Sequence, residues 1–311
     1  MNNLIIVVPC FNEEAVLCET TKQLTVVLNT IIEKKKANEC QILYVDDGSS
    51  DDTWQIIDRL NHENHYVRGL KLAHNVGHQN ALWAGMEWAC TKCDAIVSID
   101  ADLQHDVFSI IEMVDKYNEG FEVVYGVRKD RQTDSAFKKK SAVFFYTLMQ
   151  RMGVDIIKNH ADFRLLGHNA LKALMSYPER NIFVRGMVKA LGFKSTTVYF
   201  ECHDRFAGES KYTLSKMFNF AVDGITSFSV QPLRLIAAIG FIMTGLSFAA
   251  IIYALIVYIV GAAIKGWTTL LLSVWFIGGL LLLSMGILGE YVGKIYKEVK
   301  RRPRYIIEKD I

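Results

Sequence analysis

Acidic and polar residues gather in three short segments of the chain, Pro9–Glu14, Asp46–Asp51 and Asp100–His105. The third segment contains two carboxylates, Asp100 and Asp102, separated by one small residue. Such a pair can bind a ribose hydroxyl and a divalent cation. Mg²⁺ and Mn²⁺ prefer a few hard oxygen ligands and keep positions for water and phosphate. We therefore predict that Asp100 and Asp102 bind Mg²⁺ or Mn²⁺, which would stabilise a nucleoside-diphosphate leaving group.

The other polar residues of these segments suit a nucleotide. A carboxylate at Asp46 or Asp47 can accept a hydrogen bond from a base N–H, while Phe11 offers an apolar face. Asn75 opens an Asn-Val-Gly-His sequence, where the start of a helix would direct backbone N–H groups at an anion. The chain has neither GxxxxGK(S/T) nor GxGxxG after its first apolar run. A nucleotide would therefore be held by carboxylates and a cation rather than by a glycine-rich loop.

Short apolar runs alternate with helix-length segments from residue 1 to about residue 200, and this alternation predicts how the polar segments are positioned. The predicted strands are Leu4–Val8, Gln41–Val45, Arg68–Leu72, Ala95–Ile99, Glu122–Tyr125 and an edge strand at Ser195–Glu201, and the predicted helices cover about 13–36, 51–64, 78–91 and 105–119. Nearly continuous apolar strands are typical of a parallel sheet covered on both faces. The pattern predicts an α/β domain in which the loops after the strands meet at one edge. Asp51 and Asp52 alone are equally consistent with capping a helix.

Two uncharged stretches, Leu235–Ile264 and Trp267–Gly289, predict a membrane-bound protein. Each exceeds the ~20 residues that a helix needs to cross the bilayer. We divide the chain into a catalytic domain (1–211), an amphipathic juxtamembrane helix (212–231), two transmembrane helices (232–293) and a basic cytoplasmic tail (294–311). An ordinary domain helix is the alternative for 212–231. Basic residues flank the spans, and only Lys265 lies between them, so the positive-inside rule predicts a multi-pass protein of the cell membrane with both ends in the cytoplasm.

Composition excludes several other classes of protein. The net charge of +2 gives no sign of a nucleic-acid partner. The six cysteines form neither a disulfide framework nor a zinc framework, and we interpret the Cys90/Cys93 pair as chance spacing on a helix. Reduced cysteines fit a cytoplasmic location.

The motifs PCFNEE, DDGSSDDT, NVGHQNA and DADLQH, in this order, resemble those of the family 2 glycosyltransferases of GT-A fold. Three later segments, Gly126–Arg128, Asp162–Leu165 and Arg205–Tyr212, followed by two apolar stretches, are similar to the polyprenyl-phosphate glycosyltransferases. That group includes dolichol-phosphate mannose synthases and bacterial undecaprenyl-phosphate glucosyltransferases. The resemblance covers essentially the whole chain. It implies a mostly parallel, Rossmann-like sheet and inverting transfer of one sugar without a glycosyl-enzyme intermediate.

The resemblance and the residues together give a list of site residues. The predicted nucleotide-sugar contacts are Pro9, Phe11, Asn12, Glu13, Asp46, Asp47, Asn75, Asp100, Ala101, Gln104, Arg128, Arg205 and Lys211. The predicted contacts of the acceptor phosphate are Arg128, Arg131, Arg164 and Lys138, and the predicted catalytic residues are Asp102 and Asp162. A phosphomonoester is largely ionised near neutral pH, because its second pKa is about 6. We therefore expect Asp162 to position the acceptor or to orient Arg164 rather than to act as a general base.

These observations predict transfer of a single sugar, from a UDP-sugar, to undecaprenyl or another polyprenyl phosphate on the cytoplasmic membrane face, for cell-envelope glycans. A GDP-mannose transferase similar to dolichol-phosphate mannose synthase is the first alternative. A processive polysaccharide synthase is a weaker one, since no Trp follows an Arg as in the QxxRW segment of those enzymes. A sugar nucleotidyltransferase, a non-catalytic scaffold and a lipid flippase explain fewer of the residues. The family also implies a possible homo-oligomer.

Overall fold

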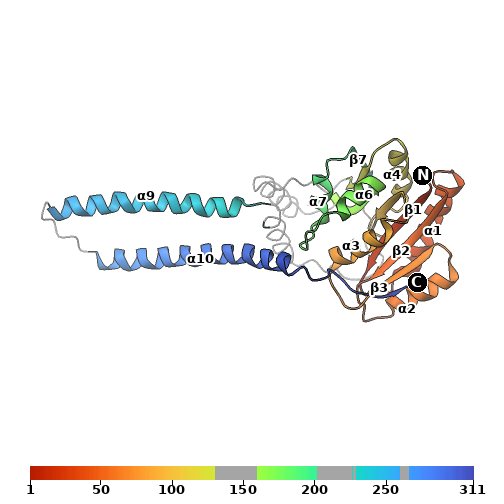
Figure 1. Cartoon of the computed structure of the whole chain (residues 1–311), viewed down its shortest axis with the longest axis horizontal. Helices are drawn as coiled ribbons and strands as arrows, with labels where there is room; N and C mark the ends of the chain where they lie inside the picture. The colour runs from red at the N-terminus through yellow and green to blue at the C-terminus, as the bar shows by residue number, and fades with distance from the viewer. Residues whose placement is uncertain (130–159, 202–225, 227–228, 260–265) are drawn as a thin grey trace. The chain divides into compact units, whose positions relative to one another are not determined.

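The computed structural model describes residues 1–129, 160–201, 226, 229–259 and 266–311 (Figure 1). These residues fall into two compact units. The sheet unit comprises 1–129, 160–201 and 301–311 of the described residues, and the helical unit comprises 226, 229–259 and 266–300.

The sheet unit contains one eight-stranded sheet with the order β7-β5-β6-β4-β1-β2-β3-β8. Its strands are β1 Asn3–Cys10, β2 Glu39–Asp46, β3 Val67–Leu72, β4 Ala95–Ser98, β5 Val123–Arg128, β6 His160–Gly167, β7 Ser195–Phe200 and β8 Ile307–Asp310. Strands β1 to β4 pair in parallel, as do β5 and β7, whereas β6 is antiparallel to β4 and β5. The predicted α/β domain and the edge strand β7 are confirmed. The sheet is mixed, however, because two antiparallel strands, β6 and β8, were not predicted.

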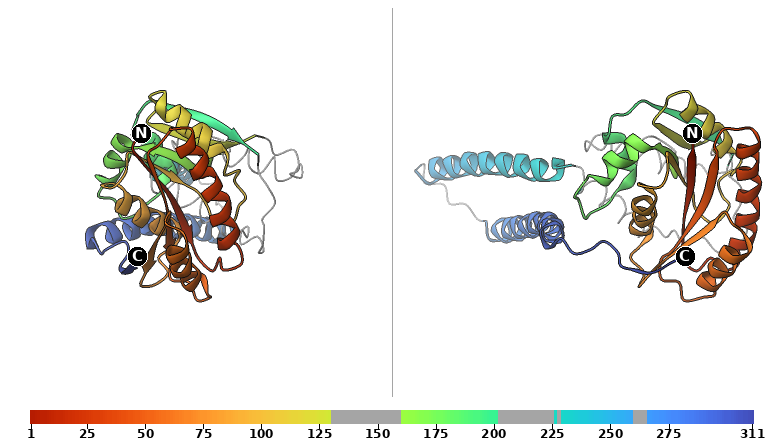
Figure 2. Two further views of the ribbon diagram at one scale, coloured as in Figure 1. Left: turned by 90° about the vertical axis from the view of Figure 1, so that its right-hand side faces the viewer. Right: turned by 45° about the vertical axis from the view of Figure 1, so that its right-hand side comes forward.

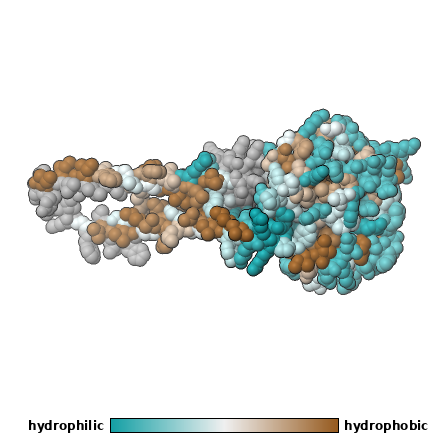
Figure 3. Space-filling view, viewed as in Figure 1, coloured by the Kyte–Doolittle hydropathy of each residue, from teal (hydrophilic) through white to brown (hydrophobic). Residues whose placement is uncertain are grey.

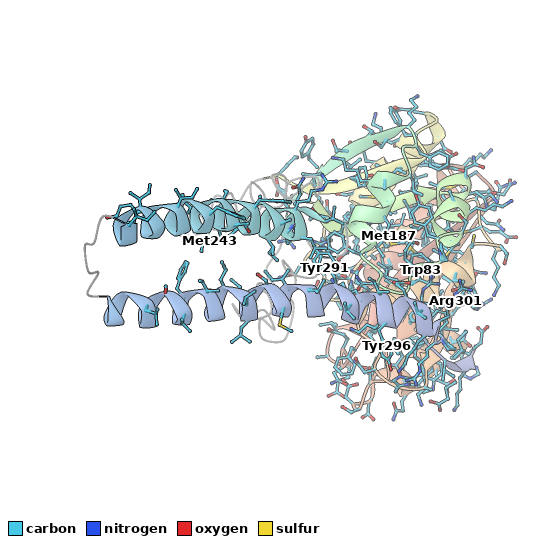
Figure 4. All side chains as sticks on the ribbon, turned by 60° about the vertical axis from the view of Figure 1, so that its left-hand side comes forward. Trp83, Met187, Met243, Tyr291, Tyr296 and Arg301 are labelled. Atoms are coloured by element: carbon cyan, nitrogen blue, oxygen red, sulfur yellow. The ribbon has the colours of Figure 1, made fainter. Side chains whose placement is uncertain are left out.

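Helices cover both faces of this sheet, and Figure 2 shows α1 and α3 on opposite sides of the central strands. The helices are α1 Leu17–Glu33, α2 Thr53–Glu63, α3 His78–Ala89, α4 Ser109–Asn118, α6 His168–Met175 and α7 Val184–Ala190. Successive side chains of β1 enter opposite layers: Ile6 packs with α1, α2 and α4, and Val7 packs with α3, α6 and α7. Trp83 and Met187, labelled in Figure 4, belong to the second layer.

The C-terminal residues 301–311 form part of the sheet unit. Strand β8 forms an edge of the sheet and pairs with β3, with Leu70 opposite Asp310 and Leu72 opposite Ile307. The backbone continues this pairing at Ile311, which exchanges N–H···O bonds of 2.9 and 3.0 Å with Gly69. We predicted a separate tail from residue 294. In the structure helix α10 continues through Lys300, and the next residues join the sheet.

The helical unit consists of α9, Gln231–Ile259, and α10, Trp267–Lys300. Large apolar side chains are exposed along both helices, as the brown surface of Figure 3 shows. Among the described residues, one segment, Phe276–Lys300, is long and apolar enough to cross a membrane, and the apolar segment Gln231–Leu246 is shorter. Two transmembrane helices therefore stay a prediction. Most of the predicted juxtamembrane helix 212–231 lies outside the described residues.

Candidate active site at the carboxyl edge of the sheet

The strand register brings the three polar segments to one edge. Cys10 at the end of β1 pairs with Asp46 at the end of β2, and Val7 pairs with Ser98 at the end of β4. Strand β6 runs antiparallel to β4, so its first residues lie at the same edge. There the Ser98 hydroxyl donates a 2.8 Å hydrogen bond to the backbone oxygen of Asp162. The start of the antiparallel strand β6 thus adds a fourth polar segment to this edge, which could not be predicted from the ends of the parallel strands.

The loops after β1 and β2 are joined through Asn12. Its side-chain oxygen accepts a hydrogen bond from the Ser50 N–H at 2.9 Å, and its own N–H donates to the Ser49 hydroxyl at 3.0 Å. Its φ of +54° is a left-handed conformation that asparagine tolerates better than most residues. Pro9 is buried below, while Phe11 remains 38% exposed. The loop pair therefore presents a phenyl ring at the surface, and the polar atoms of Asn12 hold the two loops together.

Asp46 is fully buried at the end of β2. One carboxylate oxygen accepts a hydrogen bond from the Ser49 N–H at 3.1 Å, and Oδ2 has no partner among the residues that the structure describes. Burial raises the pKa of Asp46, and the hydrogen bonds from Ser49 oppose that rise only in part. A buried oxygen without a partner is unfavourable by itself. This atom suits an incoming N–H donor such as that of a base.

Asp47 binds the loop that precedes α3. Its carboxylate accepts hydrogen bonds from the N–H groups of Val76 at 2.7 Å and Gly77 at 2.9 Å. Gly48 makes this approach possible: its φ is +66°, and a Cβ there would lie 2.6 Å from the backbone carbonyl carbon of His74. Asp47 therefore fixes the conformation of the loop that exposes Asn75.

Asp100 and Asp102 lie on the tight turn that follows β4. The turn is held by a hydrogen bond from the Gln104 N–H to Asp102 Oδ1 at 3.1 Å and by one from the Thr20 hydroxyl to the oxygen of Ala101 at 2.8 Å. The Asp100 side chain is 35% exposed. Within the described residues no group of three or more His, Cys, Asp or Glu is placed to bind a metal. Two partly exposed carboxylates fit Mg²⁺ or Mn²⁺ whose other ligands are phosphate and water.

Asp162 is buried and surrounded by donors. Arg164 forms an ion pair with its Oδ1, and Arg185 donates from Nε to Oδ1 at 3.1 Å and from Nη2 to Oδ2 at 2.8 Å. The Gln79 amide adds a 3.4 Å contact to Oδ2. Burial would raise the pKa of Asp162, but the guanidinium groups of Arg185 and Arg164 outweigh it and hold the pKa well below its usual range. Asp162 is therefore an ionised carboxylate at neutral pH.

The first residues of α3 connect the acidic turn to Asp162. His78 Nε2 lies 3.6 Å from Asp100 Oδ1 and 3.8 Å from Asp162 Oδ2. The next residue, Gln79, accepts a 3.2 Å hydrogen bond from the N–H of Val184, at the start of α7. The site therefore combines an acidic part around Asp100 with a part in which two arginines share one carboxylate.

Two contributors were missed from the sequence, and several predicted ones remain untested. Arg185 belongs to no motif, and only its pairing with Asp162 identifies it. His78 was noted only as part of the NVGHQNA segment. Arg164 is fully buried behind Asp162, and Arg128 ends β5 with a partly exposed side chain. The predicted residues Arg131, Lys138, Arg205 and Lys211 lie outside the described part of the chain.

Comparison with known proteins finds a family, relatives and solved structures to which this chain is similar. The profile of the glycosyl transferase family 2 matches residues 5–175. An uncharacterized glycosyltransferase, YkoT of Bacillus subtilis, is 51% identical over 99% of this chain and 92% of its own length. A bactoprenol glucosyl transferase derived from the SfII prophage of Shigella flexneri is 37% identical over 98% of this chain and 97% of its own. The solved glucosyl-3-phosphoglycerate synthase of Mycobacterium tuberculosis, in complex with Mn²⁺, UDP and phosphoglyceric acid, has a TM-score of 0.47 at 15% identity over 72% of this chain and 76% of its own.

The matched residues include β1 to β4 and the acidic turn at Asp100, and the two relatives extend the match over nearly the whole chain. The sheet of this protein is thus a GT-A-like mixed α/β sheet, and the chain belongs to the glycosyl transferase family 2.

Proposed function

We propose that this protein transfers one sugar from a nucleotide sugar, a UDP-sugar, to a polyprenyl phosphate such as bactoprenyl (undecaprenyl) phosphate. The observation that carries the proposal is the pairing of Asp162 with Arg164 and Arg185 beside Asp100. An acidic turn suits a cation bound to a diphosphate, and a surrounding of arginines suits a second anion. The bactoprenol glucosyl transferases that match the whole chain support the same acceptor.

Charge balance supports a reaction without a general base. An oxygen of the dianionic lipid phosphate attacks the anomeric carbon and forms a new C–O bond, and the bond from that carbon to the β-phosphate oxygen breaks. The lipid phosphate loses one negative charge and the leaving nucleoside diphosphate gains it, so no proton is transferred. Direct displacement inverts the anomeric configuration. Asp162, held ionised by two arginines, then serves to orient their guanidinium groups rather than to accept a proton.

Asp100 and Asp102 would hold a divalent cation, Mg²⁺ or Mn²⁺. The cation would neutralise the charge that develops on the leaving diphosphate. Phe11 and the unpartnered oxygen of Asp46 would contact the base on the same edge of the sheet. Uracil and guanine both carry a suitable N–H, and the glucosyl group in the names of the relatives favours a UDP-sugar over GDP-mannose.

We further propose that α9 and α10 cross the membrane as a hairpin, with the sheet unit and the C-terminus in the cytoplasm. Strand β8 pairs with β3 in one sheet, so residues before α9 and after α10 must share one side of the bilayer. One crossing would separate those strands. The uncharged run from Leu235 to Ile259 makes α9 the suitable partner of Phe276–Lys300. A reporter that is active only in the cytoplasm should be active when it is fused after Ile311. A reporter that is active only outside the cytoplasm should be inactive at the same position.

The test of the activity uses the full-length protein in detergent with radiolabelled UDP-glucose, undecaprenyl phosphate and Mn²⁺ or Mg²⁺. Label should enter the organic phase, and Asp102→Asn should abolish the transfer. Asp58→Asn, an exposed position on α2, is the matched control and should keep the wild-type rate. Absence of lipid-linked label with UDP-glucose, UDP-galactose, UDP-N-acetylglucosamine and GDP-mannose would refute the proposal.

A further inference from the structure

His105 follows the acidic turn, and its imidazole is buried in the sheet unit with 2% exposed. The ring stacks on Phe163 with 5.4 Å between centroids and a 27° angle, and it meets Phe200 edge-on at 5.1 Å. The two phenyl rings also contact each other at 5.3 Å. These contacts pack His105 into the core of the sheet unit. The phenyl rings give the carbon atoms of the imidazole an apolar contact but offer its two nitrogens no hydrogen-bond partner.

Neither ring nitrogen of His105 has a hydrogen-bond partner among the described residues. Phenylalanine would fill the same space between Phe163 and Phe200 without burying two polar atoms, so histidine is unfavourable here for folding alone. Burial lowers the pKa of His105, the charge of Asp100 opposes the change, and Arg128 adds to it. The imidazole is therefore neutral near pH 7 and keeps one N–H donor and one acceptor nitrogen.

The ring is held beside the acidic turn, because His105 follows Asp102 by three residues and stacks on Phe163, the neighbour of Asp162. Among the charges that act on the ring, that of Asp100 is the largest. Carboxylates that bind a metal are themselves oriented by hydrogen bonds, and loss of such a partner typically weakens the metal site about 10- to 100-fold. We propose that His105 is a positioning residue of the donor site, whose ring N–H donates to the carboxylate of Asp100 once donor and cation bind. The proposal rests on the proposed function and goes beyond it by assigning a role to a buried residue.

The test compares His105→Phe with the wild type in the full-length protein in detergent. Titration of Mn²⁺ in the presence of UDP should give a dissociation constant about 10- to 100-fold higher for the variant. Its Tm should stay the same or rise by about 2–4 °C, because the buried unpartnered nitrogens are gone. His105→Gln, which keeps an N–H donor, should recover part of the Mn²⁺ affinity. His65→Phe, the same replacement at an exposed position, should leave it unchanged.

A merely structural role predicts the opposite pattern. Wild-type Mn²⁺ affinity in His105→Phe would overturn the proposal, and so would a lower Tm, because the nitrogens would then have partners in the folded protein. Loss of affinity in His105→Gln equal to that in His105→Phe would also overturn it. Failure of the wild type to bind Mn²⁺ with UDP, or to label lipid, would overturn the proposed function instead.

Discussion

Replacing Arg304 by alanine should loosen the C-terminal segment from the sheet unit. The guanidinium donates hydrogen bonds to the backbone oxygens of Tyr177 at 3.0 Å and Glu179 at 2.7 Å. Its Cζ also lies 4.5 Å from the ring centroid of Trp83, which is labelled in Figure 4. We take about 1 kcal/mol for each carbonyl contact, because the side chain is half-buried, and about 0.5–1 kcal/mol for the ring. The expected loss in the free energy of unfolding is about 2.5–3 kcal/mol.

Thermal unfolding of the full-length protein, followed by tryptophan fluorescence, measures this loss. A domain of about 200 residues loses about 2–4 °C in Tm for each kcal/mol, so Arg304→Ala should unfold about 5–12 °C lower. Hydrogen exchange should also quicken at the paired backbone of Gly69 and Ile311. Arg304→Lys keeps the charge but lacks the planar guanidinium group that contacts both carbonyl oxygens, so its Tm should lie between those of the wild type and Arg304→Ala.

Arg302→Ala is the matched control, because Arg302 is exposed two residues earlier and forms no hydrogen bond or ion pair within the described part of the chain. Its Tm should stay within about 1 °C of the wild type, as expected for a surface change. Equal Tm values for Arg304→Ala and Arg302→Ala would refute the reasoning. They would mean that the contacts of Arg304 with Trp83 and with the two backbone oxygens do not stabilise the sheet unit in solution.

Three further outcomes follow from the site. Gly48→Ala should lower the Tm and weaken UDP binding, because its Cβ would lie 2.6 Å from the His74 backbone at a φ of +66°, a strain of at least about 1–2 kcal/mol. Gly120→Ala is the control: its φ is +90°, the space around its Cβ is open, and UDP binding should stay intact. The depressed pKa of Asp162 stabilises the folded protein fully above the ordinary aspartate pKa of about 4, and this stabilisation is lost as the pH falls further. In urea unfolding between pH 7 and 3, the free energy of unfolding should therefore decline less steeply for Asp162→Asn than for the wild type. An equal decline would contradict the ion pairing. Removal of divalent cations with EDTA should abolish transfer and Mn²⁺ should restore it; undiminished transfer in EDTA would exclude the assigned role of Asp100 and Asp102.

The parallel strands and the donor loops could be predicted because their pattern is local. The run Leu4–Val8 is apolar without interruption, as a strand covered on both faces must be, and the polar segment that follows it marks the strand end. Strand β6 has no such pattern: Asp162 and Arg164 interrupt it, and the sequence does not reveal that these two charges are buried together as an ion pair. Arg185 could not be assigned for the same reason, since its partner lies in a different element.

The charge of the C-terminal segment does not reveal that this segment packs on the sheet unit. Residues 294–311 carry many basic side chains, and we interpreted them as a basic cytoplasmic tail. The structure uses the long stem of Arg304 to cover Trp83 and its charge to bind two backbone oxygens, so a basic residue here joins packed elements. Pairing of β8 with β3 depends on contacts across more than two hundred residues, which no local pattern contains.

Three buried polar residues at this edge of the sheet share a physical property with functional consequences. Asp162, Arg164 and His105 are polar groups that a buried environment disfavours, and each is retained at the edge where the strands end. Asp162 is stabilised by the two arginines, whereas His105 has no partner among the described residues. A fold that needed only stability would replace an unpartnered buried imidazole with a phenyl ring. Its presence beside the acidic turn is therefore best explained by a bond that forms when the donor binds.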